Sequence, residues 1–220
     1  MSTNSETRIT KLILIPAVIT LAITLLRLIG ELQHWSTSLF NPAAGGGGAL
    51  IGISWLPPIL GIWFARKLIL NGETPASAGK VILFAILGIV LVIAGFIVGF
   101  APQLQFPGKL FVGLLMIIIA TAMQFPPWRK LFTVLFAYGL AARIPVMIIM
   151  FLAMKGNWGT HYDVAPPNFP VTDWFTKFIQ IGLLPQLFLW IPYTITFGLL
   201  TAGITAAIML RGKATRTAEA

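Results

Sequence analysis

Cysteine is absent from this sequence of 220 residues. Its absence excludes disulfides, thiol catalysis, thiolate metal sites and attachment of haem through cysteine. Several enzyme signatures are missing too: the chain has no HExxH, GxSxG, GxGxxG or P-loop motif, and no carboxylate cluster suited to phosphoryl or glycosyl transfer. We therefore expect no cofactor, and the sequence leans against an enzyme.

Charged residues are scarce, at 10% of the chain against roughly 25% in a typical soluble domain. Hydrophobic residues make up 57%, and the mean hydropathy is +0.90. No soluble core of this size buries so much apolar surface, so the lipid bilayer must be the solvent for much of the chain. Without a long polar segment there is no room for a soluble domain, and residues 1–220 form one membrane domain.

Continuous apolar runs of about 20 residues, the length needed to span a bilayer, recur along the chain. They predict an all-α, polytopic integral membrane helix bundle of about six transmembrane helices. The first is expected to be a retained helix, since no cleavage site follows it. The expected spans are 11–33, 49–70, 81–100, 109–123, 130–154 and 186–210.

The apolar stretch that ends near Leu210 is too long for one span. Thr172 and Asp173 are typical of a helix start, with an acid in the first turn. Apolar Trp174 and Phe178 then alternate with polar Lys177 in an amphipathic pattern. We expect an outer interfacial helix over 172–184, ended by Pro185, with Trp190 and Tyr193 near headgroup depth in the next span.

If the chain crosses the membrane six times, most of its positive charges lie in every second loop and at the two chain ends. The net charge of +9 therefore indicates membrane orientation rather than nucleic-acid binding. Two connections and both chain ends hold most of the Lys and Arg: Arg8, Lys11, Arg66, Lys67, Lys80, Arg129, Lys130, Arg211, Lys213 and Arg216. We expect both chain ends in the cytoplasm, in a plasma or bacterial inner membrane.

Ionisable residues inside spans are expensive, roughly 2.5–3.5 kcal/mol at a helix centre. Arg143 interrupts the fifth predicted span near its middle, and Arg27 and Glu31 lie four residues apart in the first, with His34 continuing their face. Arginine holds carboxylate or phosphate bidentately, which favours an outward-open polar cavity that binds an anion. In the alternative, Glu31 bridges the arginines and stabilises the bundle.

Two prolines interrupt the second predicted span just after Trp55. Pro57 and Pro58 are expected to kink or unwind it, and broken helices often line transport sites. A static kink filled by side chains is the alternative. The glycines at 45–48 form either a flexible linker or an anion-binding turn before that helix.

The outer loop at 158–163 carries His161 and Asp163. With His34 and Glu31 these residues would make an N2O2 metal set, but their spacing is not diagnostic, and a loop packed on the membrane surface is the better expectation. We therefore expect no metal site.

The sequence favours a small membrane protein that binds or transports an anionic or amphipathic ligand from the outer face. Its ligand-binding candidates are Arg27, Glu31, His34, Trp55, Arg143, His161 and Asp163. One alternative is a non-catalytic structural or assembly subunit of a membrane complex. Another is a lipid-acting enzyme that uses the outer His and Asp residues. Expected partners are the bilayer, an anionic or lipid-like ligand, and a membrane protein or a second copy of the chain.

Overall fold

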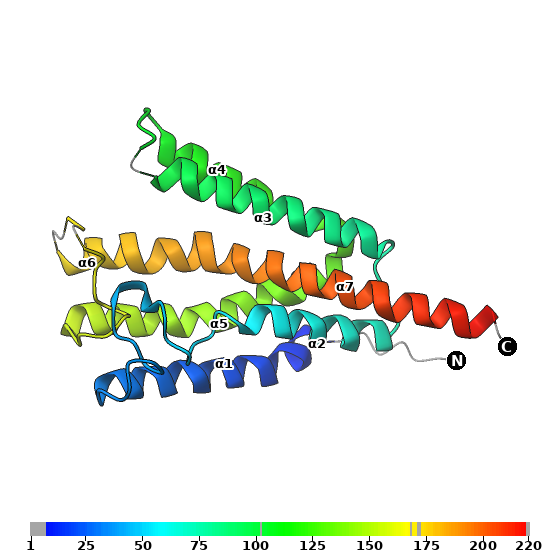
Figure 1. Cartoon of the computed structure of the whole chain (residues 1–220), viewed down its shortest axis with the longest axis horizontal. Coiled ribbons are helices and arrows are strands. Elements are labelled where there is room, and N and C mark those ends of the chain that lie inside the picture. The colour runs from blue at the N-terminus through cyan, green and yellow to red at the C-terminus, as the bar shows by residue number, and fades with distance from the viewer. Residues whose placement is uncertain (1–7, 102, 168, 171–172, 219–220) are drawn as a thin grey trace.

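The structure, a computed structural model, describes residues 8–101, 103–167, 169–170 and 173–218, with side chains up to residue 211. Its described residues form helices, turns and irregular segments, and no strand occurs among them. The prediction of an all-α protein is confirmed. The helices run roughly along one axis, and α1 begins at the end of the molecule where α7 finishes (Figure 1).

The first two helices differ in length and in how they begin. Helix α1 covers Ile9–Leu32, close to the predicted first span. Helix α2 covers only Leu56–Leu70, so the predicted start at residue 49 is wrong. Pro57 and Pro58 lie in its first turn, where a missing N–H breaks no helical hydrogen bond. They therefore start α2 rather than kink it, and the expected kink is wrong.

An irregular segment, 33–55, joins α1 to α2 and contains the short 3₁₀ helix η1 at Ala44–Gly46. The amides of Leu50 and Ile51 donate to the carbonyls of Ser38 and Leu39, which folds the segment back on itself. The tetraglycine run ends eight residues before α2 begins. The expected anion-binding turn directly before that helix is therefore not formed.

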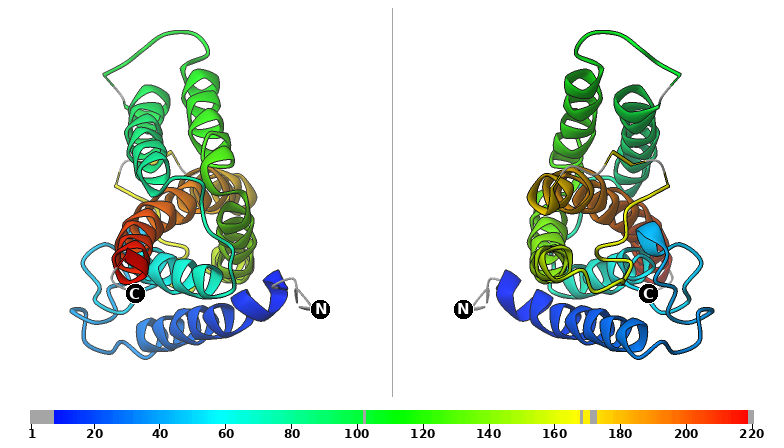
Figure 2. Two further views of the ribbon diagram at one scale, coloured as in Figure 1. Left: turned by 90° about the vertical axis from the view of Figure 1, so that its right-hand side faces the viewer. Right: turned by 90° about the vertical axis from the view of Figure 1, so that its left-hand side faces the viewer.

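Helices α3, Ala78–Phe100, and α4, Lys109–Ala122, form a hairpin. Their backbones approach closely because glycines face each other: a Cβ on Gly113 would meet Gly95 and Gly99. The hairpin stands on one side of α7 and leans away from it toward the end where 101–108 lies (Figures 1 and 2).

A turn containing the 3₁₀ helix η2, Pro126–Trp128, leads into α5, Arg129–Gly156. The Glu73 carboxylate, between α2 and α3, lies 3.7 Å from the Lys130 ammonium at the start of α5. The 71–77 loop and the α4–α5 turn therefore lie at the same end of the bundle.

The last part of the chain is one continuous helical stretch. It consists of α6 at Trp174–Lys177, the π-helical segments η3 at Phe178–Leu183 and η4 at Gln186–Trp190, and α7 at Ile191–Ala218. The Asp173 carboxylate accepts hydrogen bonds from the amides of Phe175 and Thr176, so the predicted helix start at Asp173 is confirmed, whereas Thr172 lies outside the described residues.

Pro185 does not end this helix, and the predicted separate interfacial helix over 172–184 is wrong. Pro185 has helical backbone angles (φ −63°, ψ −37°) and lies between the two π-helical segments. A proline lacks the N–H of a regular turn and crowds the preceding turn, and the wider π-helical turns on both sides accommodate it.

Two apolar clusters fill the bundle, and α5 contributes to both. Helices α2, α3, α5 and α7 surround the larger cluster, which includes Phe64, Leu135 and Leu199. The smaller cluster lies where α5 packs against η3, and it includes Met150 and Phe178. End-on views place α1 and the α3–α4 hairpin on opposite sides of this assembly (Figure 2).

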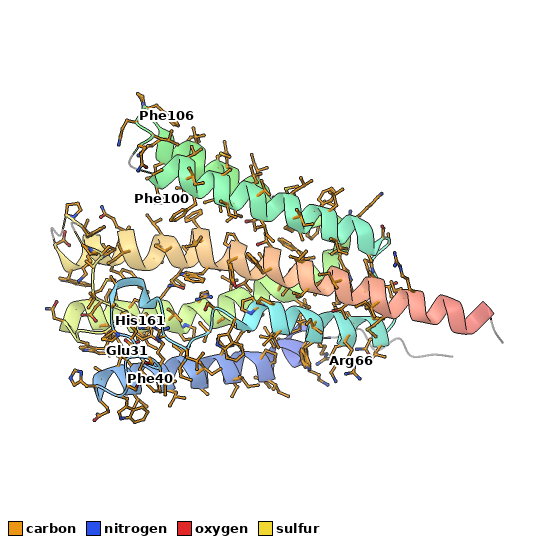
Figure 3. The ribbon with its side chains drawn as sticks, viewed as in Figure 1. Glu31, Phe40, Arg66, Phe100, Phe106 and His161 are labelled. Carbon is orange, nitrogen blue, oxygen red and sulfur yellow. The ribbon has the colours of Figure 1, made fainter. Side chains whose placement is uncertain are left out.

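Four stretches of the described chain are long and apolar enough to cross a membrane: Ile9–Leu32, Ala78–Phe100, Lys109–Gly156 and Trp174–Arg211. The third contains both α4 and α5, and α2 is too short to qualify. Arg66 marks one end of the bundle, and His161, Phe100 and Phe106 lie toward the other (Figure 3). The helices are compatible with a membrane protein.

Candidate functional site

A buried cluster of Arg27, Glu31 and His161 joins α1 to the loop after α5. It is here called the outer polar cluster because Glu31 and His161 lie toward the end of the bundle away from Arg66 (Figure 3). The Arg27 Nε donates to Glu31 Oε1 at 2.8 Å, across one turn of α1. The His161 amide donates to Glu31 Oε2 at 2.9 Å, and His161 Nδ1 lies 2.6 Å from Oε1. The Glu31 side chain has no exposed surface and is fully engaged.

Arg27 also holds the glycine-rich segment. Its Nη2 donates to the carbonyl of Gly46 at 2.9 Å and to that of Asn41 at 3.3 Å. Gly46 has a φ of +64°, and a Cβ there would collide with Arg27 and with the His161 ring. Gly46 therefore lies directly against the outer polar cluster, and both its conformation and the lack of space require glycine at this position.

Burial sets the protonation of this cluster. It lowers the pKa of the His161 imidazole below its ordinary value of 6.5, and the nearby Arg27 charge acts in the same direction, while the hydrogen bond to Glu31 opposes both. His161 is consequently neutral at pH 7 and its Nδ1–H donates to Glu31. One carboxylate thus neutralises one guanidinium, which leaves the outer polar cluster without net charge.

Asp163 shapes the loop that carries His161. Its carboxylate accepts hydrogen bonds from the amides of Gly159 and Thr160, at 3.0 and 2.7 Å, and from the Thr160 hydroxyl at 2.8 Å. Because Asp163 is bonded within its loop and His161 to Glu31, the His–Asp arrangement required by the lipid-acting enzyme alternative is not formed.

Arg143 is the only charged residue in the middle of α5, a helix of 28 residues. It separates the two apolar clusters, since Ala142 belongs to one and Val146 to the other. Only 4% of Arg143 is exposed. Its Nη1 donates to the Gln186 Oε1 over 3.4 Å, a long contact, and its Nε has no hydrogen-bond partner. No ion pair to Arg143 occurs among the described residues.

The π-helical segment η4 supplies both neighbours of this guanidinium. Gln186 is its first residue and Trp190 its last, and the Arg143 Cζ lies 4.7 Å from the centre of the Trp190 ring. This is a cation–π distance. Trp190 thus packs beside the middle of α5, and its expected headgroup depth stays a prediction. Short π-helical turns occur frequently at functional sites.

The start of α2 lies near this group. The Trp190 ring contacts the Tyr193 ring at a centroid distance of 5.6 Å, and the Tyr193 hydroxyl donates to the carbonyl of Ser54 at 2.9 Å. Ser54 is two residues before Leu56, where α2 begins. Because α2 has 15 residues, its length is about 22 Å, and segment 33–55 occupies the remaining length of the bundle.

Buried tyrosines lie between α1 and α5. The Tyr162 hydroxyl donates to the carbonyl of Thr24 at 3.2 Å, and the Tyr138 and Thr20 hydroxyls are hydrogen-bonded at 2.8 Å. Burial raises the pKa of Tyr162, whose hydroxyl lies within electrostatic reach of Arg27, Glu31 and Arg143. Tyr162 is thus the neutral neighbour shared by Arg143 and the outer polar cluster.

The structure brings three of the seven predicted site residues together and separates the rest. Arg27, Glu31 and His161 meet; Asp163 supports them, and Arg143 forms a second site with Gln186 and Trp190. His34 and Trp55 are exposed. The His34 amide donates to the Glu31 carbonyl at 3.1 Å, but no side-chain hydrogen bond among the described residues joins His34 or Trp55 to these groups. Within the described part of the chain, no group of three or more His, Asp or Glu side chains could hold a metal ion.

Sequence reasoning missed Gln186, Trp190 and Gly46. Gln186 is the only polar residue between Gly182 and Trp190, and a lone polar residue in an apolar run was a usable signal. Gly46 had no such signal, because its contacts come from the tertiary structure. The chain matches no known protein family, no curated protein and no solved structure.

Proposed function

We propose that this chain is a six-span membrane protein that binds an anionic small molecule at Arg143. The carrying observation is the Arg143 guanidinium, which is buried, is paired with no carboxylate among the described residues and leaves its Nε unbonded. A buried charge without a partner is strongly unfavourable. In a membrane, where water is scarce, an anion that binds this group relieves that penalty.

The six crossings are α1, the 33–55 segment together with α2, α3, α4, α5, and the long helix from Trp174. With this topology the C-terminal end of α2 and the first turn of α5, which carry Arg66, Lys67, Arg129 and Lys130, face the cytoplasm. Both chain ends lie on the same side, according to the positive-inside rule. The outer polar cluster then lies on the opposite side of a plasma or bacterial inner membrane.

The 33–55 segment favours entry from that outer side. Irregular backbone at membrane depth is tolerated where protein buries it or where it lines a water-filled cavity. Gly47, Gly48 and Ser54 are exposed along this segment, and we propose that water fills the space beside it down to the start of α2. Binding would begin there, and transport would require a further opening toward the cytoplasm.

Native mass spectrometry of the protein released from its own membrane tests this proposal. We expect a small anionic adduct on the wild-type chain and on Arg66→Leu, which alters an exposed arginine. Arg143→Leu should remain folded and lose the adduct. A wild-type chain without an adduct contradicts the proposal.

The alternative, a non-catalytic subunit of a membrane complex, is favoured by the outer polar cluster, whose contacts are internally satisfied as in a structural element. Arg143 would then serve packing. That alternative is supported if Arg143→Leu fails to fold and Arg143→Lys restores folding without any adduct.

A further inference from the structure

We infer that the anion bound at Arg143 is a monovalent organic carboxylate with an apolar body, held side-on by the free edge of the guanidinium and by the Gln186 amide. This inference rests on the proposed function, because it names the ligand class of that same site. It follows from the N–H groups of Arg143 that donate no hydrogen bond among the described residues.

The geometry leaves one particular edge of the guanidinium free. Nη1 is directed at Gln186, and the Trp190 ring lies near the guanidinium. Nε has no partner, and no hydrogen bond from Nη2 occurs among the described residues. Nε and Nη2 present two parallel N–H groups, and this fork matches the two oxygens of a carboxylate.

Gln186 adds a donor beside that edge. Its Oε1 accepts from Arg143, so its Nε2 is the group left for a ligand. Among the described residues, the only hydrogen bond of Nε2 is to the Met150 thioether sulfur at 3.5 Å, a weak acceptor. A carboxylate bound to the Arg143 fork can take this third hydrogen bond. The NH2 group of a carboxamide would instead face these donors, with the weak Met150 sulfur as its acceptor.

Charge balance favours a single negative charge. Arg143 carries one positive charge, and its titratable electrostatic neighbours are the hydroxyls of Tyr138, Tyr162 and Tyr193, which are neutral at pH 7. A monoanion makes the site neutral. A dianion, such as a phosphonate that has lost both of its protons, leaves one negative charge in a medium of low dielectric constant, where isolated charge is costly.

The surroundings favour an apolar body behind the carboxylate. Val146 and Met150 follow Arg143 on the same face of α5 and belong to the smaller apolar cluster. Trp190 provides an aromatic surface on the facing helix. Sites for small organic molecules combine such apolar walls with a few fixed polar groups.

Ligand-dependent thermal stability of the purified protein in lipid nanodiscs tests the inference. The probes are linear carboxylates from acetate to decanoate, each with the amide and the phosphonate of the same chain length. We expect at least one carboxylate to raise the melting temperature by several degrees at saturation. Its amide should give no shift. Its phosphonate, assayed at a pH above its second pKa so that it is a dianion, should give a smaller shift than the carboxylate.

Three variants make the result specific. The shift should persist in Arg66→Gln, and disappear in Arg143→Gln. Gln186→Leu should weaken carboxylate binding about tenfold or more, because it removes one hydrogen bond to a charged group. If Arg143→Gln does not fold, Arg143→Lys serves in its place; it keeps the charge, lacks the fork, and should lose the preference for carboxylate over phosphonate.

Two failures are distinguishable. If phosphonates stabilise the protein through Arg143 as well as or better than carboxylates, the ligand class is wrong and the proposed anion site stands. If no probe shifts the melting temperature, or if the shift survives Arg143→Gln, the carboxylate site is refuted. An adduct lost in Arg143→Leu would then still support an anion of another class, and no such adduct would refute the proposed function as well.

Discussion

Two buried arginines of this bundle differ in what their guanidinium groups contact. Arg27 donates to a carboxylate one helical turn away and to two backbone carbonyls. Arg143 has one long hydrogen bond and an aromatic ring. At the residue scale this difference indicates that Arg27 stabilises the fold, and it is the reason why we propose Arg143 as the ligand-binding residue.

Glu31→Gln should destabilise the protein strongly. The change removes the charge that compensates Arg27 while the guanidinium stays buried, a loss of about 3–5 kcal/mol in comparable buried pairs. The matched control is Glu73→Gln, which breaks a partly exposed pair with Lys130 at 3.7 Å and should cost less than about 1 kcal/mol. Thermal or denaturant unfolding in detergent measures both. Equal effects would show that the outer polar cluster is not a stabilising contact.

The stability of the protein should fall on acidification because of His161. Its pKa is below 6.5 in the folded protein and ordinary in the unfolded chain, so between these two values the unfolded state binds more protons. The stability that depends on neutral His161 is fully present above about pH 6.5, and it is lost as the pH falls from there through the pKa of His161 in the folded protein. The charged groups facing the imidazole are Arg27, Glu31 and Asp163.

His161→Asn should flatten this dependence, since an amide replaces the Nδ1–H donor and does not titrate. The comparison is the melting temperature at pH 7.5 and 5.5, for the wild-type chain, for His161→Asn and for His34→Asn at an exposed position. An unchanged pH dependence in His161→Asn, or its loss in His34→Asn, would contradict the assignment.

The two sites were predictable from the sequence to different degrees. The Arg27–Glu31 contact follows from their four-residue spacing on a helix. The arrival of His161 depends on how a loop 130 residues away folds back, which local patterns do not encode. Gln186 and Trp190 were missed for a specific reason: Pro185 was interpreted as a helix end, whereas the π-helical turns around it let the helix continue.

At the scale of elements, the bounds of a helix were predicted well where its apolar run and the residues that flank it indicate the same start and end. Helices α1, α3, α4 and α5 lie within a few residues of the expected spans. The start of α2 was misplaced because the residues before Pro57 are as apolar as a helix while their backbone is irregular. Hydropathy measures burial in lipid and does not distinguish a helix from an irregular segment packed inside a bundle.

Gly113→Val should separate α3 from α4. A side chain there would meet the backbone of Gly95 and Gly99, and overpacking of this kind typically costs about 1–3 kcal/mol. Gly79→Ala is the control, because the nearest atom to its added Cβ is the Ser77 hydroxyl oxygen at 3.8 Å. Melting temperatures in detergent should drop for the first variant alone. A neutral Gly113→Val would mean that the hairpin is not held by this contact.

At the scale of the whole molecule, the account requires both chain ends on the cytoplasmic side. Because the chain has no cysteine, single cysteines report topology without background. Ser38→Cys and Asn157→Cys should react with an impermeant thiol reagent on intact cells. Ser77→Cys and Thr215→Cys should react only after permeabilisation. Labelling of Ser77→Cys in intact cells would reverse the orientation.

The charge at the centre of the bundle is the claim on which the functional account depends, and density beside Arg143 tests it most directly. A structure determined from protein kept in its native lipid should contain a ligand with oxygens about 2.7–2.9 Å from the Arg143 Nε and Nη2. Nε and Nη2 bonded only to protein groups or ordered water would contradict the account and make Arg143 a packing residue.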